Sequence, residues 1–310
     1  MSTDTIAAPP AAPEPAQRPV TASSRRQQKF RENLREFARN TPGIIGLVFL
    51  LVIIALALLA PVIVPRETLN VIKVTAAPNE PPSGAHILGT DPLGRDVLGM
   101  LLWGSRISLL VGFTATVVSM VIGTTVGMIT GHLKGVGEWI MLRVIDFFLV
   151  IPSLVLAIVL SSVLERGVLT IIIALGVTSW AGTARIVRSQ TLAVESRPYI
   201  ERAKALGASG SHIISYHVLP AVMPLVLANT TLAVGSAIIS ESTLSFLGLG
   251  DPTVISWGSM LKSALDTGSA TAGYWWFVLP PGLAIVLVVL CFTLVGRALE
   301  SVINPTLRKR

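Results

Sequence analysis

The hydrophobic residues of this chain fall into six apolar blocks separated by polar segments. A helix of about 20 apolar residues is about 30 Å long, which matches the hydrocarbon core of a bilayer. The pattern therefore predicts an all-α, polytopic membrane protein with six transmembrane helices. The predicted spans are 44–63, Ile107–Thr130, Phe147–Leu164, Gly167–Ala184, Val218–Ser240 and Phe277–Gly296.

The basic residues predict the direction in which these helices cross. With both termini in the cytoplasm, 18 of the 24 Lys and Arg residues lie on the cytoplasmic side and six lie outside. Cytoplasmic loops of membrane proteins carry the excess of Lys and Arg. The asymmetry predicts an N-in/C-in topology, with Asp91 and Trp257 outside.

Composition agrees with a membrane protein. Hydrophobic residues make up 52% of the chain and charged residues 13%, about half of the ~25% usual in soluble domains. The net charge is +7, and many of the basic residues lie beside the apolar blocks. This placement favours contact with membrane lipids over nucleic acid. The lone cysteine, Cys291, lies inside an apolar block, and the four histidines are scattered, so no metal site is predicted.

The tail before the first span is basic. After an Ala- and Pro-rich start that predicts disorder, Phe30, Leu34 and Phe37 line one face of a helix suited to an anionic lipid surface. A solvated basic tail is the alternative. The predicted regions are a cytoplasmic tail (1–40), a first transmembrane helix with an outer loop (41–103), a five-helix core (104–305) and a basic C-terminal tail (306–310).

The cytoplasmic segment 199–220 has the most specific pattern. It predicts a short helix, a glycine break, a second short stretch and a proline at the start of the next span. An ordinary amphipathic loop is the alternative. The segment resembles the EAA loop of binding-protein-dependent ABC importer permeases, with Arg202 and His217 replacing the usual Ala and Ile. The residues that match the family spacing are Glu201, Ala203, Gly207, Leu219 and Pro220.

The outer loop carries a second pattern. Asp91, Pro92 and Gly94 have the spacing of a type I turn. The stretch 88–96 resembles the outer-loop signature of the dipeptide, oligopeptide and nickel subfamily of these permeases, as do 143–146, 245–250 and 257–258. The signature residues are Gly89, Thr90, Asp91, Gly94, Arg95 and Asp96.

This resemblance implies one permease subunit of an ABC importer for dipeptides or oligopeptides, working by alternating access in the cytoplasmic membrane. A nickel-chelate importer is the alternative. The resemblance further implies a second homologous permease, two ATPase subunits that receive the EAA loop, and an extracytoplasmic substrate-binding protein. The pathway would lie between the two permeases, lined mainly by helices two to six.

The sequence contains no Gly-Lys dipeptide and therefore no Walker A phosphate-binding loop. We accordingly expect ATP and Mg²⁺ on the partner ATPase subunits. We expect no cofactor and no catalytic residue on this chain.

Two further patterns suggest helix contacts. Gly123, Gly127 and Gly131 form overlapping GxxxG motifs, which permit close helix packing. Arg143 and Asp146 are three residues apart at the inner end of the third span, a spacing that suits an ion pair. A proton relay at Asp146 is the alternative.

Rival functions fit less well. An ion-coupled carrier usually needs ionisable groups at mid-membrane, and the six predicted spans contain none. The Gly207–Gly210 stretch resembles the motif of rhomboid-type proteases, but Ser209 falls in a charged loop. Ser259 and Lys262 fit a Ser-x-x-Lys pattern that often arises by chance.

Overall fold

The computed structural model describes residues 31–32 and 34–303. The predictions for the start of the tail, for Phe30 and for 306–310 lie outside these residues. The described part is helical, and its one β-type pairing is the bridge between Thr90 and Asp96. The predicted all-α fold is confirmed.

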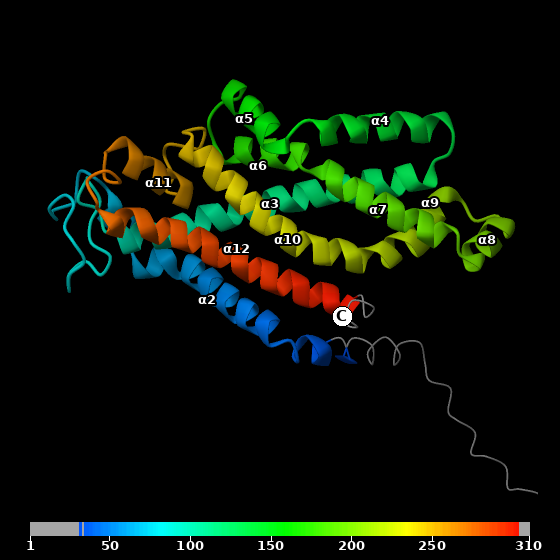
Figure 1. Ribbon diagram of the computed structural model, residues 1–310, viewed down its shortest axis with the longest axis horizontal. Helices are drawn as coiled ribbons and strands as arrows, with labels where there is room; N and C mark the ends of the chain where they lie inside the picture. The colour runs from blue at the N-terminus through cyan, green and yellow to red at the C-terminus, as the bar shows by residue number, and fades with distance from the viewer. Residues whose placement is uncertain (1–30, 33, 304–310) are drawn as a thin grey trace, which may run out of the picture.

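The helices follow one another along the chain as in Figure 1. Their bounds are α2 (Thr41–Ile63), η1 (Arg66–Leu69), α3 (Val97–His132), α4 (Val136–Val150), α5 (Ser153–Val163), α6 (Val168–Thr178), α7 (Trp180–Glu195), α8 (Pro198–Ala205), α9 (Gly210–His212), the π-helical turn η2 (Ile213–Val218), α10 (Leu219–Phe246), α11 (Trp257–Asp266) and α12 (Trp275–Ile303).

Six membrane crossings account for the described chain if α4 and α5 form one bent span. The other five crossings are long, apolar helical stretches, and each contains most or all of one predicted block. The chain is therefore a multi-pass membrane protein. The five stretches are Thr41–Ile63, Val97–His132, Val168–Glu195, Gly210–Phe246 and Trp275–Val302.

The prediction of one continuous span over Phe147–Leu164 is wrong. The axes of α4 and α5 meet at 84°. Pro152 explains the break, because proline lacks an N–H and disfavours a helical residue before it. Ile151 accordingly has extended backbone, with φ −82° and ψ 125°. Since α4 begins at Val136, most of the stretch between the second and third predicted spans is also helical.

Other helices run beyond the apolar blocks that predicted them. α3 begins at Val97 rather than Ile107, and α7 ends at Glu195 rather than Ala184. The 36 residues of α3 make a helix of about 54 Å, longer than the ~30 Å hydrocarbon core. Apolar blocks mark the part of a helix that lies in lipid, whereas backbone hydrogen bonds continue into the polar regions.

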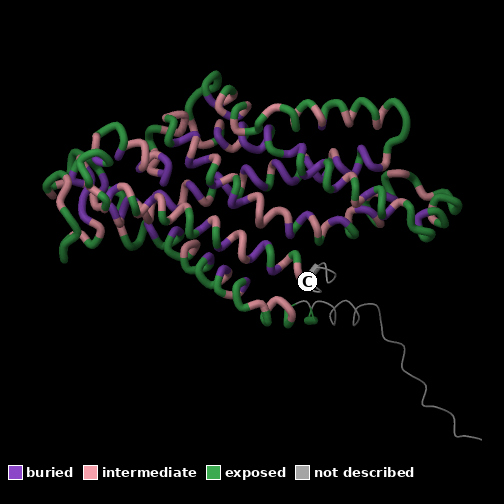
Figure 2. The backbone as a smooth tube through the Cα atoms, viewed as in Figure 1, coloured by how far each residue is buried: buried purple, intermediate pink, exposed green. Residues whose placement is uncertain are grey.

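Helix α3 is central. It packs against α2, α6, α7 and α10, and Figure 2 shows buried residues concentrated along the inner helices. The outward side chains of α2 and α4 are apolar and exposed, as Val62 (79% exposed) and Val150 (81% exposed) illustrate. Exposed apolar surface of this kind suits contact with lipid tails.

Buried apolar clusters fix the two ends of the molecule. At one end Val97, Trp257 and Phe277 join α3, α11 and α12. At the other end Met128 and Ile200 join α3 to the short helix α8. Figure 1 shows the start of α2 and the end of α12 on the side of α8, away from α11.

The orientation can be tested by cysteine labelling in a Cys291→Ser background. Asp91 and Trp257 are almost completely buried, so we choose Ile72 (92% exposed) and Leu206 (89% exposed). The excess of basic residues near α8 predicts that this end is cytoplasmic. An impermeant maleimide added to intact cells should label Ile72→Cys and leave Leu206→Cys unlabelled until the cells are opened. Labelling of Leu206→Cys in intact cells would contradict the topology.

Candidate functional site

The segment 199–220 begins with helix α8, which ends in a glycine turn. Gly207 has a φ of +86°, a left-handed conformation that favours glycine. The Ala208 N–H donates to the Ala203 carbonyl and the Gly207 N–H to the Lys204 carbonyl, each at 3.0 Å. These two bonds define a Schellman motif, which ends the helix and turns the chain sharply.

The chain then returns to the bundle through two short elements. Ser209 caps α9, since its Oγ accepts a hydrogen bond from the His212 N–H at 3.3 Å. The π-helical turn η2 follows and runs into α10 at Leu219. Pro220 occupies the first turn of α10, where its missing N–H costs little.

Buried side chains hold this segment against the bundle. Ile200 of α8 and Ile213 of η2 are fully buried in a cluster with Met128 of α3 and Val194 of α7. Removing such a side chain from water is worth roughly 1.5–3 kcal/mol. The segment is therefore packed into the bundle rather than loosely attached to it.

A polar network adds to this attachment. Glu195, the last residue of α7, bonds His132 at the end of α3. Its other carboxylate oxygen lies 2.9 Å from Lys204 Nζ on α8. A Cβ on Gly210 would come within 2.5 Å of His132 Nε2. One carboxylate thus joins the inner ends of α3 and α7 to the short helix.

The outward face of the same segment is exposed. Leu206 is 89% exposed and Tyr216 70% exposed. Glu201 is exposed and forms no ion pair within the described chain, while Ala203 is half-buried. The rings of Tyr216 and His212 stack at 4.6 Å. Arg202, next to Glu201, is exposed as well. A face with apolar and charged side chains beyond the membrane helices, fixed from behind, suits contact with another protein.

The outer-loop signature forms a compact knot around Asp91. This carboxylate is fully buried and accepts hydrogen bonds from the N–H groups of Leu93 (2.9 Å) and Arg95 (2.7 Å). The Arg95 guanidinium pairs with its other oxygen at 2.6 Å. The Gly94 N–H donates to the Asp91 carbonyl at 2.9 Å, which closes the expected turn.

The remaining signature residues join this knot to α3. Asp96 caps α3 by accepting from the Gly99 N–H at 2.7 Å, and it also bonds His86. The buried Thr90 hydroxyl donates to the Ala77 carbonyl at 2.8 Å. Gly89 and Gly94 have positive φ, and backbone carbonyls lie against the position of a Cβ in both. The signature thus builds the outer loop and places no reactive group.

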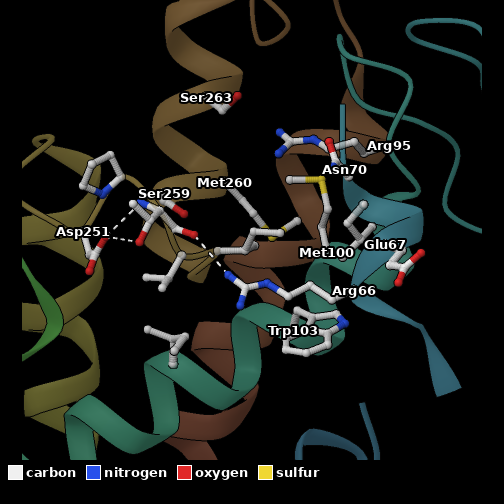
Figure 3. Close-up of a pocket in the computed structure, with 16 residues that line it drawn as sticks. Arg66, Glu67, Asn70, Arg95, Met100, Trp103, Asp251, Ser259, Met260 and Ser263 are labelled. Atoms are coloured by element: carbon white, nitrogen blue, oxygen red, sulfur yellow. Dashed lines mark hydrogen bonds between the residues drawn. The ribbon is translucent and has the colours of Figure 1, made fainter. Parts of the chain in front are cut away.

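A pocket of about 630 Å³ opens beside this knot (Figure 3). Arg66 donates to the Thr253 carbonyl at 3.4 Å, and its guanidinium carbon lies 5.8 Å from the centre of the Trp103 ring. The Thr253 hydroxyl donates to Asp251 at 2.6 Å and lowers the pKa of that carboxyl. The outer end therefore presents a mixed-charge, partly aromatic hollow, formed by η1, α3, α11 and the loop before α11.

Comparison with known families decides the identity. Residues 123–309 match the model described as "Binding-protein-dependent transport system inner membrane component", and residues 29–82 match "N-terminal TM domain of oligopeptide transport permease C". The chain belongs to this permease family. It is a multi-pass protein of the cytoplasmic membrane and a permease subunit of an ABC transport system.

Similar permeases cover nearly the whole chain. The oligopeptide transport system permease protein OppC of Bacillus subtilis (strain 168) is 36% identical over 90% of this chain and 90% of its own length. The dipeptide permease DppC of the same organism is 37% identical over 89% of this chain and 85% of its own. The glutathione permease GsiD of Pectobacterium atrosepticum is 34% identical over 94% and 95%.

In this permease, the glycine stripe of α3 lies directly against α7. A Cβ on Gly123 would stand 2.7 Å from the Trp180 carbonyl, and one on Gly127 would stand 2.6 Å from the Ala184 carbonyl. A Cβ on Gly131 would meet the Thr191 side chain at 2.7 Å. All three distances are shorter than real Cβ contacts, so the absence of side chains here permits the approach of the two helices.

The charges of α4 attach it to α7. Asp146 lies 2.6 Å from Arg185 of α7 and 3.6 Å from Arg143 of its own helix. About two turns closer to the start of α4, Glu138 pairs with Arg188 at 2.5 Å. Partly exposed pairs contribute about 0–1 kcal/mol each. The arrangement is that of ion pairs between neighbouring helices.

Sequence reasoning missed Glu241, the first residue after a predicted span. α10 continues past it, and the side chain is 1% exposed. Its carboxylate accepts from Ser108 of α3 at 2.9 Å and from Ser245 at 2.8 Å, while Ser108 Oγ accepts from the Trp257 N–H at 3.3 Å. The spanning helices therefore do carry an ionisable group, which ties α3, α10 and α11 together near their outer ends. The serines around this acid were the available signal.

The close contact between α3 and α7 can be tested by adding a single methyl group. Gly127→Ala should destabilise the permease by about 1–3 kcal/mol, because the new Cβ meets a backbone carbonyl. Gly182→Ala in α7 is the matched control, since nothing lies within 4 Å of its Cβ position. Thermal denaturation in detergent should show a lower melting temperature for Gly127→Ala alone. Equal melting temperatures would exclude close packing at Gly127.

The outer knot yields a second prediction. Asp91→Ala should cost about 3–5 kcal/mol, because it leaves Arg95 and two backbone N–H groups without their acceptor. Limited proteolysis from the outer side should cut the loop more rapidly. Glu67→Ala, which removes an exposed pair with Lys73, should change the rate little. Similar cutting rates in the two variants would show that the knot does not hold the loop.

Proposed function

We propose that this chain is one of two permease subunits of an importer for dipeptides or short oligopeptides, driven by separate ATPase subunits. The segment 199–220 would dock on an ATPase and pass its movement to the transmembrane helices. The observation that carries the proposal is that this segment is fully exposed on one face and tightly fixed to α3 and α7 on the other.

The exposed face has the chemistry of a docking surface. Leu206 is almost fully exposed at the end of α8. Glu201 has no ion-pair partner within the described chain, so its carboxylate can bind a basic group on a partner. Gly207 forms the turn that presents both of them. Movement of a partner bound here would pull on Ile200 and Lys204, and through them on the inner ends of α3 and α7.

Energy would come from partner subunits, because the sequence contains no Gly-Lys dipeptide and hence no Walker A loop. ATP and Mg²⁺ would bind to those subunits. The mixed-charge pocket at the outer end would face an extracytoplasmic binding protein that delivers the substrate. Transport would then proceed by alternating access between this chain and a homologous permease.

The peptide substrate is inferred from the relatives, whose names state oligopeptide, dipeptide and glutathione transport. Glutathione is itself a small peptide. The described residues contain no group of three or more His, Cys, Asp or Glu side chains placed to hold a metal ion. The names of the relatives favour peptides over the nickel alternative.

Docking can be tested by pull-down of the ATPase subunits. Gly207→Val forces a β-branched side chain into left-handed backbone, at a cost of about 1–3 kcal/mol, and Glu201→Lys reverses the exposed charge. Both variants should reach the membrane in normal amounts yet retain ATPase subunits about tenfold less well. Peptide uptake should fall in parallel.

Two matched variants separate docking from general damage. Gly135→Val strains another positive-φ glycine with open surroundings, and Glu165→Lys reverses an exposed charge at the outer end. Both controls should keep ATPase binding. Normal pull-down and uptake in Gly207→Val and Glu201→Lys would contradict the docking role and favour an ordinary solvated loop.

A further inference from the structure

A cavity of about 330 Å³ lies at mid-height between α3, α6–α7, α10 and the α4–α5 bend. Its walls are formed by 115–120 near the midpoint of α3, by 175–186 near the midpoint of Val168–Glu195, and by 229–240 in the middle of α10. The cavity therefore lies at the depth of the hydrocarbon core.

Its lining is polar but uncharged. Half of the lining residues are Ser, Thr or Asn, and none is Asp, Glu, Lys, Arg or His. Several of the polar ones come from separate parts of the chain, namely α3, α5, the junction of α6 with α7, and α10, and meet at this cavity. They include Ser119, Ser153, Ser179, Asn229 and Ser236.

Most of these polar groups are left without partners. Within the described chain, the side chains of Ser119, Ser179, Asn229 and Ser236 form no hydrogen bond, although Ser119 is only 4% exposed. Many other hydroxyls of the spanning helices bond their own helix, as Thr130 does to the Val126 carbonyl at 2.7 Å, although Thr124 and Ser161 are buried without a partner. Asn229 is half-buried, and Ser179 and Ser236 are exposed. Polar side chains at membrane depth are costly against lipid, so this set suits a path that is filled by water or a polar solute.

Two helix breaks occur beside this cavity. α5 starts at Ser153 after the Pro152 break, and α6 gives way to α7 at Ser179. Figure 1 shows α5 turned away from α4, next to α6. Irregular backbone at this depth is tolerated where it is covered by protein or lines an aqueous cavity. Two breaks at one polar cavity favour the aqueous path.

We propose that this cavity is the share of the peptide pathway contributed by this chain, and that it binds the peptide backbone through neutral hydrogen bonds. The proposal rests on the proposed function. Ser and Asn side chains both donate and accept, and so does every peptide unit of the substrate. An uncharged wall treats acidic and basic side chains alike, whereas a charged one would exclude one class. Ser236 and Gly182 are exposed, and the second permease would close that side.

Accessibility is tested first, in the assembled importer with its partner permease, ATPases and binding protein. In a Cys291→Ser background, Ser236→Cys should react with a charged methanethiosulfonate reagent at least about tenfold faster than Ile239→Cys. Ile239 is the matched control, because it is 48% exposed on the same helix and does not line the cavity. A transported tripeptide with ATP should slow the reaction at position 236 only. Equal rates, or no effect of peptide, would overturn the proposal.

Charge selection is tested second, with two tripeptides of equal length, one with a central Glu and one with a central Lys. Ser236→Asp should shift the uptake ratio about tenfold toward the Lys peptide, and Ser236→Lys should shift it about tenfold toward the Glu peptide. Ser236→Asn should leave the ratio unchanged. Because each ratio is taken within one preparation, it does not depend on the amount of protein. An unchanged ratio in both charged variants that retain uptake would overturn the proposal.

The unsubstituted importer separates the two hypotheses. If it takes up neither peptide with ATP, the proposed function itself fails. If it transports both peptides while position 236 is unreactive and indifferent to charge, only the assignment of the pathway fails.

Discussion

Helix α3 approaches α7 so closely that three positions of its contact face, Gly123, Gly127 and Gly131, leave no room for a side chain. At Gly123 and Gly127 the backbone of α3 lies against carbonyls of α7, and the rest of the bundle is arranged around this pair. Lipid tails are as apolar as Leu, so helices in a bilayer associate through close packing and polar contacts. The small residues of α3 permit the close packing. The Glu241 carboxylate makes a polar contact where α3 meets α10.

This central pair also connects the two surfaces of the molecule. At its outer end, α3 is capped by Asp96 within the signature knot. At the inner end of α3, His132 bonds Glu195 of α7. Glu195 also pairs with Lys204 of α8, in the segment 199–220. A force applied to α8 would thus reach both helices at once. The polar mid-membrane cavity lies between these ends, where a relative movement of α3, α7 and α10 would change its width.

Much of this was predictable from local pattern. Apolar blocks predicted where helices cross, and Gly207 and the Asp91–Gly94 spacing predicted turns, because each depends on a few adjacent residues. The break at Pro152 was not predicted, since proline is tolerated inside some transmembrane helices. The burial of Asp91 depends on a loop folding over it, and that of Glu241 on Ser108, which is 133 residues away. Contacts of that kind leave no trace in periodicity.

The central claim is that the segment 199–220 moves as one body with the inner ends of α3 and α7. Spin labels at Leu206 and at Leu192 of α7, both exposed, measure this directly by pulsed electron paramagnetic resonance in the Cys291→Ser importer. The structure predicts one narrow distance distribution that is the same without nucleotide and with ATP trapped by vanadate. A distance that changes between the two states would show that the segment swings independently and would contradict the account.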